Sequence, residues 1–229
     1  MNLLCLPIKM LRAIIFDLDN TLIDFLKYKR LCSEAAIDAM IDAGLKIPKE
    51  KAVKELYRLM KTHGMEDNTI FQKLLKKLTG DIDYRKLASA INAYRKTRIG
   101  LLTPYPGTKS TLIRLKEKGL KLAIVTDAPK LKAYLRLTAM KLDDFFDVVI
   151  AKEDTGKLKP DNLPFKAAIK ELKLPPQECL MVGDMPERDI KGAKALNLKT
   201  CFAKYGYEGK AEPKADYTID SIEELADIF

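Results

Sequence analysis

Histidine, tryptophan and paired cysteines are scarce or absent in this sequence. The 229-residue chain contains one histidine, His63, and no tryptophan, so catalysis that needs several histidines is nearly excluded. Four cysteines occur without a CxxC pair or a neighbouring histidine, which argues against a zinc site or a disulfide framework. They are Cys5, Cys32, Cys179 and Cys201. We therefore expect a reducing compartment, the cytoplasm, and chemistry that relies on carboxylates, hydroxyls and lysines.

Long hydrophobic runs are also missing. No apolar stretch approaches the roughly 18 residues that a membrane-spanning helix needs, so we expect no membrane segment. The apolar residues 3–6 are too few for a secretion signal and Pro7 interrupts them, so residues 1–9 are expected to be peripheral. The length suits one large domain, or one domain with an insert.

Positive charge exceeds negative charge, with 41 lysines and arginines against 32 aspartates and glutamates, which is a net charge of +9. A nucleic-acid partner is one interpretation of such a balance. The lysines are nevertheless spread along the whole chain, and no basic stripe with interleaved aromatic residues occurs. We therefore expect no nucleic-acid partner and a site that attracts anions.

Apolar residues recur at helical spacing from Phe25 to about Arg98, in four stripes. The stripes contain Leu31, Ala35, Ala39 and Ala43, with Ala36 and Met40 beside them; Val53, Leu56, Tyr57 and Met60; Ile70, Phe71, Leu74, Leu75 and Leu78; and Leu87, Ile91 and Tyr94, with Arg98 marking the end of the fourth. Gly44 is expected to end the first helix and Gly80 the third. No strand pattern intervenes, so we predict a separate α-helical bundle over residues 24–103.

Short apolar runs alternate with helical segments in the rest of the chain. The runs are 12–16, 122–125, 148–151, 180–182, 200–203 and 217–219, and the helical segments are 108–118, 130–140, 162–172, 187–195 and 221–228. This order is typical of βαβ units and predicts an α/β fold with a Rossmann-like parallel sheet. The core domain would combine residues 1–23 and 104–229, with the helical bundle inserted between the first and second strands.

Polar clusters follow four of the predicted strands, at the sheet edge where open α/β proteins bind their ligands. The clusters are Asp17-Leu-Asp19-Asn-Thr21, Thr126-Asp127, Lys159-Pro160, and Gly183-Asp184 with Asp189 five residues further on. A carboxylate just past a buried strand is unfavourable unless it is hydrogen-bonded or bound to a metal. Turn chemistry alone therefore explains these clusters poorly.

These four motifs, in this order and with a helical insert after the first, resemble the haloacid dehalogenase-like (HAD) superfamily of aspartate-nucleophile phosphohydrolases. The resemblance covers nearly the whole chain, and the insert resembles the C1-type helical cap of that superfamily. The DxDNT form is most similar to archaeal-type phosphatases of small metabolites, including enzymes that act on glyceraldehyde 3-phosphate and phosphoglycolate. The resemblance implies a Mg²⁺-dependent phosphatase of a small phosphorylated metabolite, because a cap excludes bulky substrates.

The resemblance also implies roles for the carboxylates. Asp17 would be the nucleophile and form an aspartyl-phosphate, while Asp19 would be the general acid and base. The Asp17 carboxylate, the backbone carbonyl of Asp19 and the Asp184 carboxylate would hold Mg²⁺. Asp189 would support the waters of the metal or orient a lysine. Without the other motifs, Asp184 could simply cap the helix that follows it.

Two further motif residues are expected to contact the phosphate. Thr126 would donate a hydrogen bond to a phosphoryl oxygen, and Lys159 would neutralise charge on the phosphate and the nucleophile. Lys159 is preferred over Lys157 because it directly precedes a proline, as in the family pattern. The family often has asparagine after the threonine, whereas Asp127 stands here and adds negative charge near the phosphate.

Three basic residues, Lys27, Lys29 and Arg30, begin the helical insert. They form either a solvated helix face or contacts to the anionic end of a substrate, so they are candidate specificity residues. His63 is expected to be an exposed charge near a helix end, and Thr21 a turn or N-cap hydroxyl.

Other functions use the same scaffold. A phosphomutase would employ the same Asp17 and Asp19, whereas a non-catalytic phospho-ligand-binding protein would need neither. The intact set of Asp17, Asp19, Lys159 and Asp184 favours an enzyme. We expect a monomer or a homodimer.

Overall fold

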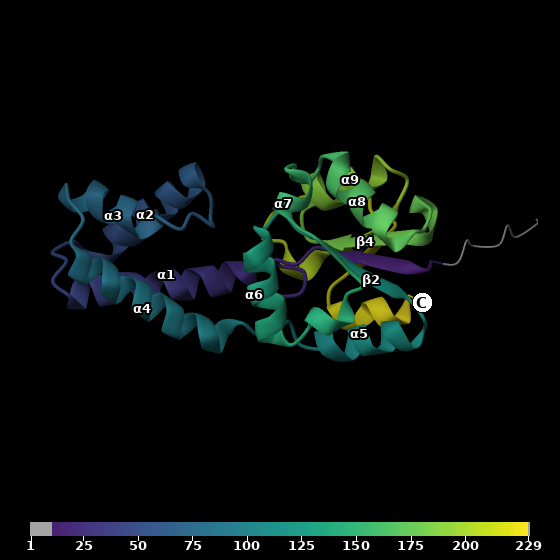
Figure 1. Cartoon of the computed structure of the whole chain (residues 1–229), viewed down its shortest axis with the longest axis horizontal. Coiled ribbons are helices and arrows are strands. Elements are labelled where there is room, and N and C mark those ends of the chain that lie inside the picture. Colours follow the sequence, from purple (N-terminus) through teal and green to yellow (C-terminus); the bar gives the residue numbers. More distant parts are fainter. Residues whose placement is uncertain (1–10, 229) are drawn as a thin grey trace, which may run out of the picture. The chain divides into compact units, whose positions relative to one another are not determined.

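The computed structural model describes residues 11–228 and divides the chain into two compact units (Figure 1). One unit combines the chain up to Asp24 with the chain from Thr103 onward, and the other is Phe25–Leu102. The expectations for residues 1–9 and for Cys5 lie outside the described residues. Within them, no helix has the length and apolar character needed to cross a membrane.

A six-stranded sheet forms the centre of the first unit, with the strand order β3-β2-β1-β4-β5-β6. The strands are β1 Ala13–Phe16, β2 Lys121–Val125, β3 Val148–Ile150, β4 Cys179–Gly183, β5 Lys199–Ala203 and β6 Tyr217–Ile219. Every neighbouring pair is parallel. The predicted α/β fold with a Rossmann-like parallel sheet is therefore confirmed. The chain extends the sheet from β1 to one side with β2 and β3 and to the other side with β4, β5 and β6. Open α/β sheets bind their ligands outside the carboxyl ends of the strands, at such a change of direction.

Helices cover both faces of this sheet (Figure 1). The α-helices are α5 Thr108–Glu117, α6 Lys130–Met140, α7 Lys152–Thr155, α8 Asn162–Leu172 and α9 Lys191–Lys194, and the 3-10 helices are η1 Asp143–Phe145, η2 Pro176–Glu178, η4 Lys204–Gly206 and η5 Ile222–Asp227. One apolar cluster joins β1, β2 and β4 to α8, with Ile15, Val125, Met181 and Phe165 fully buried. Strands buried on both faces explain why these runs are continuously apolar rather than alternating.

Two expected helices differ from the structure. The predicted helix 187–195 is a π-helical turn, η3 Pro186–Ile190, followed by the single turn α9. The Asp189 carboxylate accepts the backbone N–H of Met185 at 2.9 Å, which closes this wide turn from inside. The predicted closing helix 221–228 is the 3-10 helix η5.

The second unit contains four α-helices, α1 Phe25–Asp42, α2 Lys49–His63, α3 Ile70–Thr79 and α4 Tyr84–Leu101. They pack around their own apolar cluster, which includes Ile37, Leu56 and Leu74. His63 is exposed at the end of α2, as expected.

The buried face of α1 is centred beside the expected stripe, on Ala36 and Met40, which were expected next to that stripe, and on Ile37. Leu31 and Ala35 are only partly buried, whereas Ala36, Ile37 and Met40 are fully buried. The larger side chains of Ile37 and Met40 remove more apolar surface from water than the alanines of the expected stripe. Cys32, on the same helix, is buried and free, as are Cys179 and Cys201 in the sheet unit.

Candidate active site

The first motif begins where β1 ends. The Asp17 backbone N–H donates to the carbonyl of Val182 at 2.9 Å, which continues the sheet pairing to the buried carboxylate. The chain then turns tightly, because the N–H of Asn20 donates to the carbonyl of Ile23 at 2.7 Å. Asn20 adopts a left-handed conformation with φ 57°, which asparagine tolerates better than most residues.

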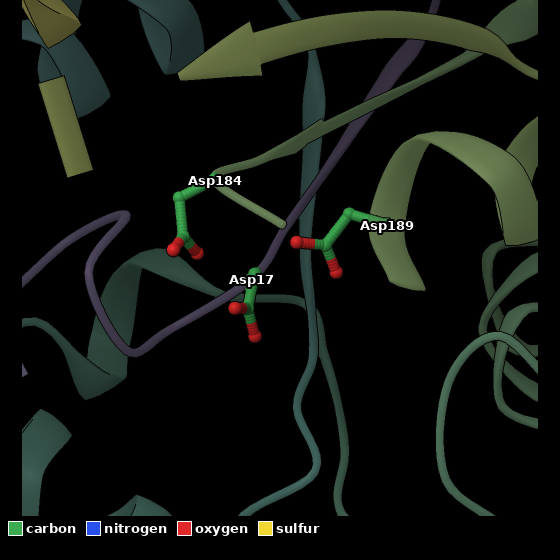
Figure 2. Close-up of side chains that lie close together, drawn as sticks. All are labelled: Asp17, Asp184 and Asp189. Atoms are coloured by element: carbon green, nitrogen blue, oxygen red, sulfur yellow. The ribbon is translucent and has the colours of Figure 1, made fainter. Parts of the chain in front are cut away.

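Three buried carboxylates gather at this edge of the sheet (Figure 2). Asp17 follows β1, Asp184 follows β4 and Asp189 lies in η3. One oxygen from each lies within 4.8 Å of the others. Gly183 permits this approach, since a Cβ there would lie 2.4 Å from the Asp189 carboxyl carbon. An all-oxygen donor set of this kind is the one that hard cations such as Mg²⁺ prefer.

Lys159 lies between two of these carboxylates. Its Nζ is 2.7 Å from Oδ1 of Asp17 and 2.7 Å from Oδ1 of Asp189. The same ammonium donates to the carbonyl of Val125 at 3.0 Å, at the end of β2. Burial alone would lower the pKa of Lys159, but the two carboxylates raise it above its ordinary value, so the side chain remains charged.

The cluster as a whole carries excess negative charge. Burial raises the pKa of Asp17 well above its ordinary value, although Lys159 opposes that shift. Burial, with the charge of Asp189, also raises the pKa of Asp184 to about 7. Three buried carboxylates against one ammonium leave charge that a divalent cation would neutralise, so the residues present fit a bound Mg²⁺.

Thr126 follows β2 and is buried. Its backbone N–H donates to the carbonyl of Ile150, and its Oγ1 accepts the N–H of Ala128 at 3.2 Å. These contacts place the hydroxyl on the same edge of the sheet as the carboxylate cluster, since β2 and β1 are parallel neighbours. The hydroxyl proton remains available for donation, because its oxygen acts as the acceptor in this turn.

The neighbouring Asp127 has a structural partner that the sequence alone did not indicate. Its Oδ1 accepts the backbone N–H of Lys159 at 2.8 Å, and its Oδ2 is 3.2 Å from Nη1 of Arg188. Asp127 therefore ties the loop that carries Lys159 to the end of β2, and Arg188 offsets its charge.

Asp19 is partly buried and faces an arginine from α6. Its Oδ2 is 3.2 Å from Nη1 of Arg136, whose side chain is 5% exposed. Sequence reasoning missed Arg136, although a signal was present. Arg136 falls on the apolar face of its helix, between Ala133 and Leu137 in the buried stripe, where an arginine requires a partner.

A turn after β5 supports the first motif. Tyr205, in η4, donates a hydrogen bond from its hydroxyl to the carbonyl of Thr21 at 2.7 Å. The buried Thr21 hydroxyl in turn donates to Oδ1 of Asp184 at 3.4 Å. The predicted turn hydroxyl of Thr21 thus contacts the acidic cluster directly.

The three basic residues at the start of the insert lie on α1, in the second unit. Lys27 and Arg30 are exposed, whereas Lys29 is 6% exposed. The Nζ of Lys29 donates to the hydroxyl of Tyr94 at 3.1 Å and lies 5.2 Å from the centre of its ring. Lys29 therefore has partners inside the helical unit.

The parallel sheet and the carboxylate and lysine cluster at the ends of its strands define a class of hydrolase. The profile of the family described as haloacid dehalogenase-like hydrolase matches residues 14–203. The chain belongs to this family, as the motifs predicted.

Relatives that are named as phosphatases match nearly the whole chain. The chain is 37% identical over 221 residues to a glyceraldehyde 3-phosphate phosphatase of Methanocaldococcus jannaschii, an alignment that covers 96% of this chain and 97% of the relative. It is 34% identical to the protein of the same name from Pyrococcus furiosus, over 96% of this chain and 93% of the relative. The predicted enzyme class, a HAD-type phosphatase, is confirmed at this level.

Solved structures agree with the fold. A HAD phosphatase from Thermococcus onnurineus superimposes with a TM-score of 0.69 at 29% identity, over 95% of this chain and 97% of that chain. A HAD hydrolase from Bacillus subtilis, solved bound to magnesium, superimposes with a TM-score of 0.70 at 26% identity, over 96% of this chain and 99% of that chain.

Proposed function

We propose that this protein is a Mg²⁺-dependent phosphatase that hydrolyses a small phosphorylated metabolite through an aspartyl-phosphate on Asp17. One observation carries the proposal. The buried Lys159 ammonium contacts Asp17 and Asp189 beside Asp184, so the proposed nucleophile, a fixed cation and a cluster of acidic side chains meet at one point. The names of the relatives make glyceraldehyde 3-phosphate the first substrate to test. Among the described residues, Cys32, Cys179 and Cys201 are free and buried, which supports a reducing compartment such as the cytoplasm.

The first half-reaction transfers the phosphoryl group to the protein. An oxygen of Asp17 attacks phosphorus and forms a P–O bond, while the P–O bond to the substrate alcohol breaks. Asp19 gives its proton to the departing alcohol oxygen. Lys159 holds Asp17 in place and neutralises charge on the transferring group, and Thr126 donates a hydrogen bond to one of its oxygens.

The second half-reaction restores the enzyme. Water attacks the phosphorus of the aspartyl-phosphate and gives its proton to Asp19, which the first step left as a carboxylate. The P–O bond to Asp17 breaks, and inorganic phosphate leaves. The same carboxyl group therefore serves as acid and then as base, and no other proton acceptor is needed.

Mg²⁺ would be held by the carboxylates of Asp17 and Asp184 and by the backbone carbonyl of Asp19. When bound, it supplies positive charge that offsets the repulsion between a carboxylate and a phosphate dianion. Asp189 is a supporting residue in this proposal, because Lys159 and the Met185 N–H already occupy its two oxygens.

Residues 24–103 are proposed to form the cap that selects the substrate, in a monomer or a homodimer. Among the basic residues at its start, the exposed Lys27 and Arg30 are the candidates for contact with an anionic group of the substrate. Lys29 was also predicted to serve specificity. Its burial against Tyr94 supports a role in holding α1 to α4.

The proposal is tested by phosphate release from a panel of small esters in the presence and absence of Mg²⁺. The panel includes glyceraldehyde 3-phosphate, phosphoglycolate, p-nitrophenyl phosphate, sugar phosphates and nucleotides. Asp17→Asn is expected to lower turnover by about 10³-fold or more, because it removes the nucleophile. The matched control, Asp144→Asn, changes an exposed aspartate in η1 and should leave turnover unchanged.

Two outcomes would contradict the proposal. Well-folded protein that releases phosphate from no ester with Mg²⁺ would exclude a general phosphatase. Interconversion of sugar phosphate isomers that requires a sugar bisphosphate primer would identify a phosphomutase instead.

A further inference from the structure

A second buried cation lies in the sheet unit, separate from Lys159. Arg136 of α6 is 4% exposed, and its Nη1 is 3.2 Å from Oδ2 of Asp19. Asp19 and Arg136 are 117 positions apart in the chain. Their contact therefore joins the first motif to a helix that carries none of the four motifs.

Burying a guanidinium is unfavourable unless a carboxylate and further hydrogen bonds compensate it. Arg136 belongs to the buried face of α6, which also contains Ala133, Leu137 and Met140. An apolar side chain in place of Arg136 would fill this buried face by packing alone. The presence of arginine therefore points to its carboxylate partner, and the planar guanidinium fixes that partner's direction better than an ammonium does.

Two different cations thus hold the two carboxylates of the first motif. Lys159 holds Asp17 from the loop that follows α7, and Arg136 holds Asp19 from α6. Asp17 and Asp19 are only two positions apart, so without separate anchors both carboxylates could turn toward the same ammonium. The paired arrangement keeps one carboxylate for attack on phosphorus and leaves the other for proton transfer.

We propose that Arg136 is a positioning residue for Asp19, which orients the Asp19 carboxyl group for proton transfer to and from the substrate. This inference rests on the proposed function, because it takes Asp19 as the acid and base of a phosphatase. Arg136 touches neither phosphorus nor the metal in this role. In this role it acts through Asp19.

A positioning role predicts a dependence on the leaving group. An alkyl phosphate such as glyceraldehyde 3-phosphate needs a proton on its departing oxygen, whereas p-nitrophenolate leaves without one. Arg136→Met is therefore expected to lower kcat for the alkyl ester by about tenfold or more, with little change in KM. The initial burst of p-nitrophenolate, which reports phosphoryl transfer to Asp17, should change less than about threefold.

A double-mutant cycle separates this role from a purely structural one. Arg136→Met is measured in the wild-type protein and in the Asp19→Asn variant, with the p-nitrophenolate burst and steady-state release of phosphate as readouts. If Arg136 acts through Asp19, it has no further effect once the carboxylate is gone. Arg114→Met is the matched control, since Arg114 is an exposed arginine of α5 paired with Asp227. It should leave both readouts unchanged.

The outcomes distinguish the failure of this inference from the failure of the proposed function. If the wild-type protein hydrolyses no ester, the proposed function fails first. If the wild type is active but Arg136→Met slows the p-nitrophenolate burst as much as it lowers kcat for the alkyl ester, and slows the burst in the Asp19→Asn background too, the positioning role is overturned. Circular dichroism and melting temperature check folding. Should Arg136→Met unfold, Arg136→Lys is judged by the same comparison of alkyl-ester kcat with the p-nitrophenolate burst, because an ammonium keeps the charge without the planar geometry.

Discussion

At the scale of single residues, the acidic cluster contains more carboxylates than ammonium groups. Asp17, Asp184 and Asp189 are buried together, and Lys159 contacts two of them. The raised pKa of Asp184, about 7, follows from burial first and the nearby charge of Asp189 second. A proton and a metal ion are therefore alternative ways to neutralise this carboxylate.

This competition predicts a pH dependence of metal binding. The folded pKa of Asp184 lies above its unfolded value, so its protonation stabilises the metal-free protein at low pH, and that stabilisation is lost as pH rises through about 7. Saturating Mg²⁺ should consequently raise the melting temperature more at high pH than at low pH. We expect an increase of about 5 °C or more at pH 8, and much less at pH 5.5.

The measurement is a set of thermal melts with EDTA or with Mg²⁺ across this pH range. Asp184→Asn should abolish most of the Mg²⁺ effect, whereas Asp144→Asn at the surface should preserve it. An increase that is the same at every pH would show that Asp184 does not titrate in this window.

At the scale of elements, the short helix η4 sets the position of the first motif. A Cβ on Gly206 would lie 1.7 Å from the carbonyl oxygen of Asn20, so only glycine permits this approach. Tyr205 adds its hydrogen bond to Thr21 and stacks edge-on against Tyr105, with ring centres 5.0 Å apart. The turn after β5 is thus shaped around the loop that carries Asp17.

Gly206→Ala is therefore expected to displace this loop. We predict a loss of kcat of about tenfold or more, together with a fall in stability of about 1–3 kcal/mol. Gly100→Ala is the control, because in the described part of the chain nothing beyond its own turn of α4 lies within 4 Å of the added Cβ, and alanine favours a helix. Activity and urea denaturation measure both effects. Wild-type kcat in Gly206→Ala would show that the catalytic loop does not depend on this contact.

The helices and strands also differ in how well the sequence pattern predicted their residue ranges. Strands and long helices follow from periodicity, so α6, α8 and β6 have the predicted residues. The π-helical turn η3 was not predicted from periodicity. In this turn the Asp189 side chain reaches back to the Met185 N–H. A single hydrogen bond of this kind leaves no periodic signal.

At the scale of the whole molecule, two units each contain their own apolar core. Leu56, Leu74 and Met40 are fully buried within the helical unit. A core of this kind can support independent folding even in a small domain.

We predict that residues 25–102, expressed alone, form a helical bundle with cooperative thermal unfolding. Leu56→Ala should destabilise it by about 2–5 kcal/mol, because it leaves a cavity in the core. Lys61→Ala, at an exposed position of α2, should change stability by less than about 0.5 kcal/mol. Circular dichroism during heating measures both. A fragment without helical signal, or without a cooperative transition, would contradict the prediction.

The sequence by itself determined the layout of the sheet unit and the family. Local periodicity identifies strands and helices, and parallel strands place their carboxyl ends at one edge. Asp17, Lys159, Asp184 and Asp189 could thus be assigned to one site before any contact was known. The roles given to them remain proposals.

Only the tertiary structure decided which charges meet. The Asp19–Arg136 pair spans 117 positions, the contact of Asp127 with the Lys159 N–H spans 32, and the contact of Tyr205 with Thr21 spans 184. Such contacts depend on how separate elements pack, and no local spacing in the chain encodes that packing. The motifs therefore indicated the edge of the sheet at which the carboxylates gather, while packing decided which partner Asp17, Asp19 and Asp127 each contact.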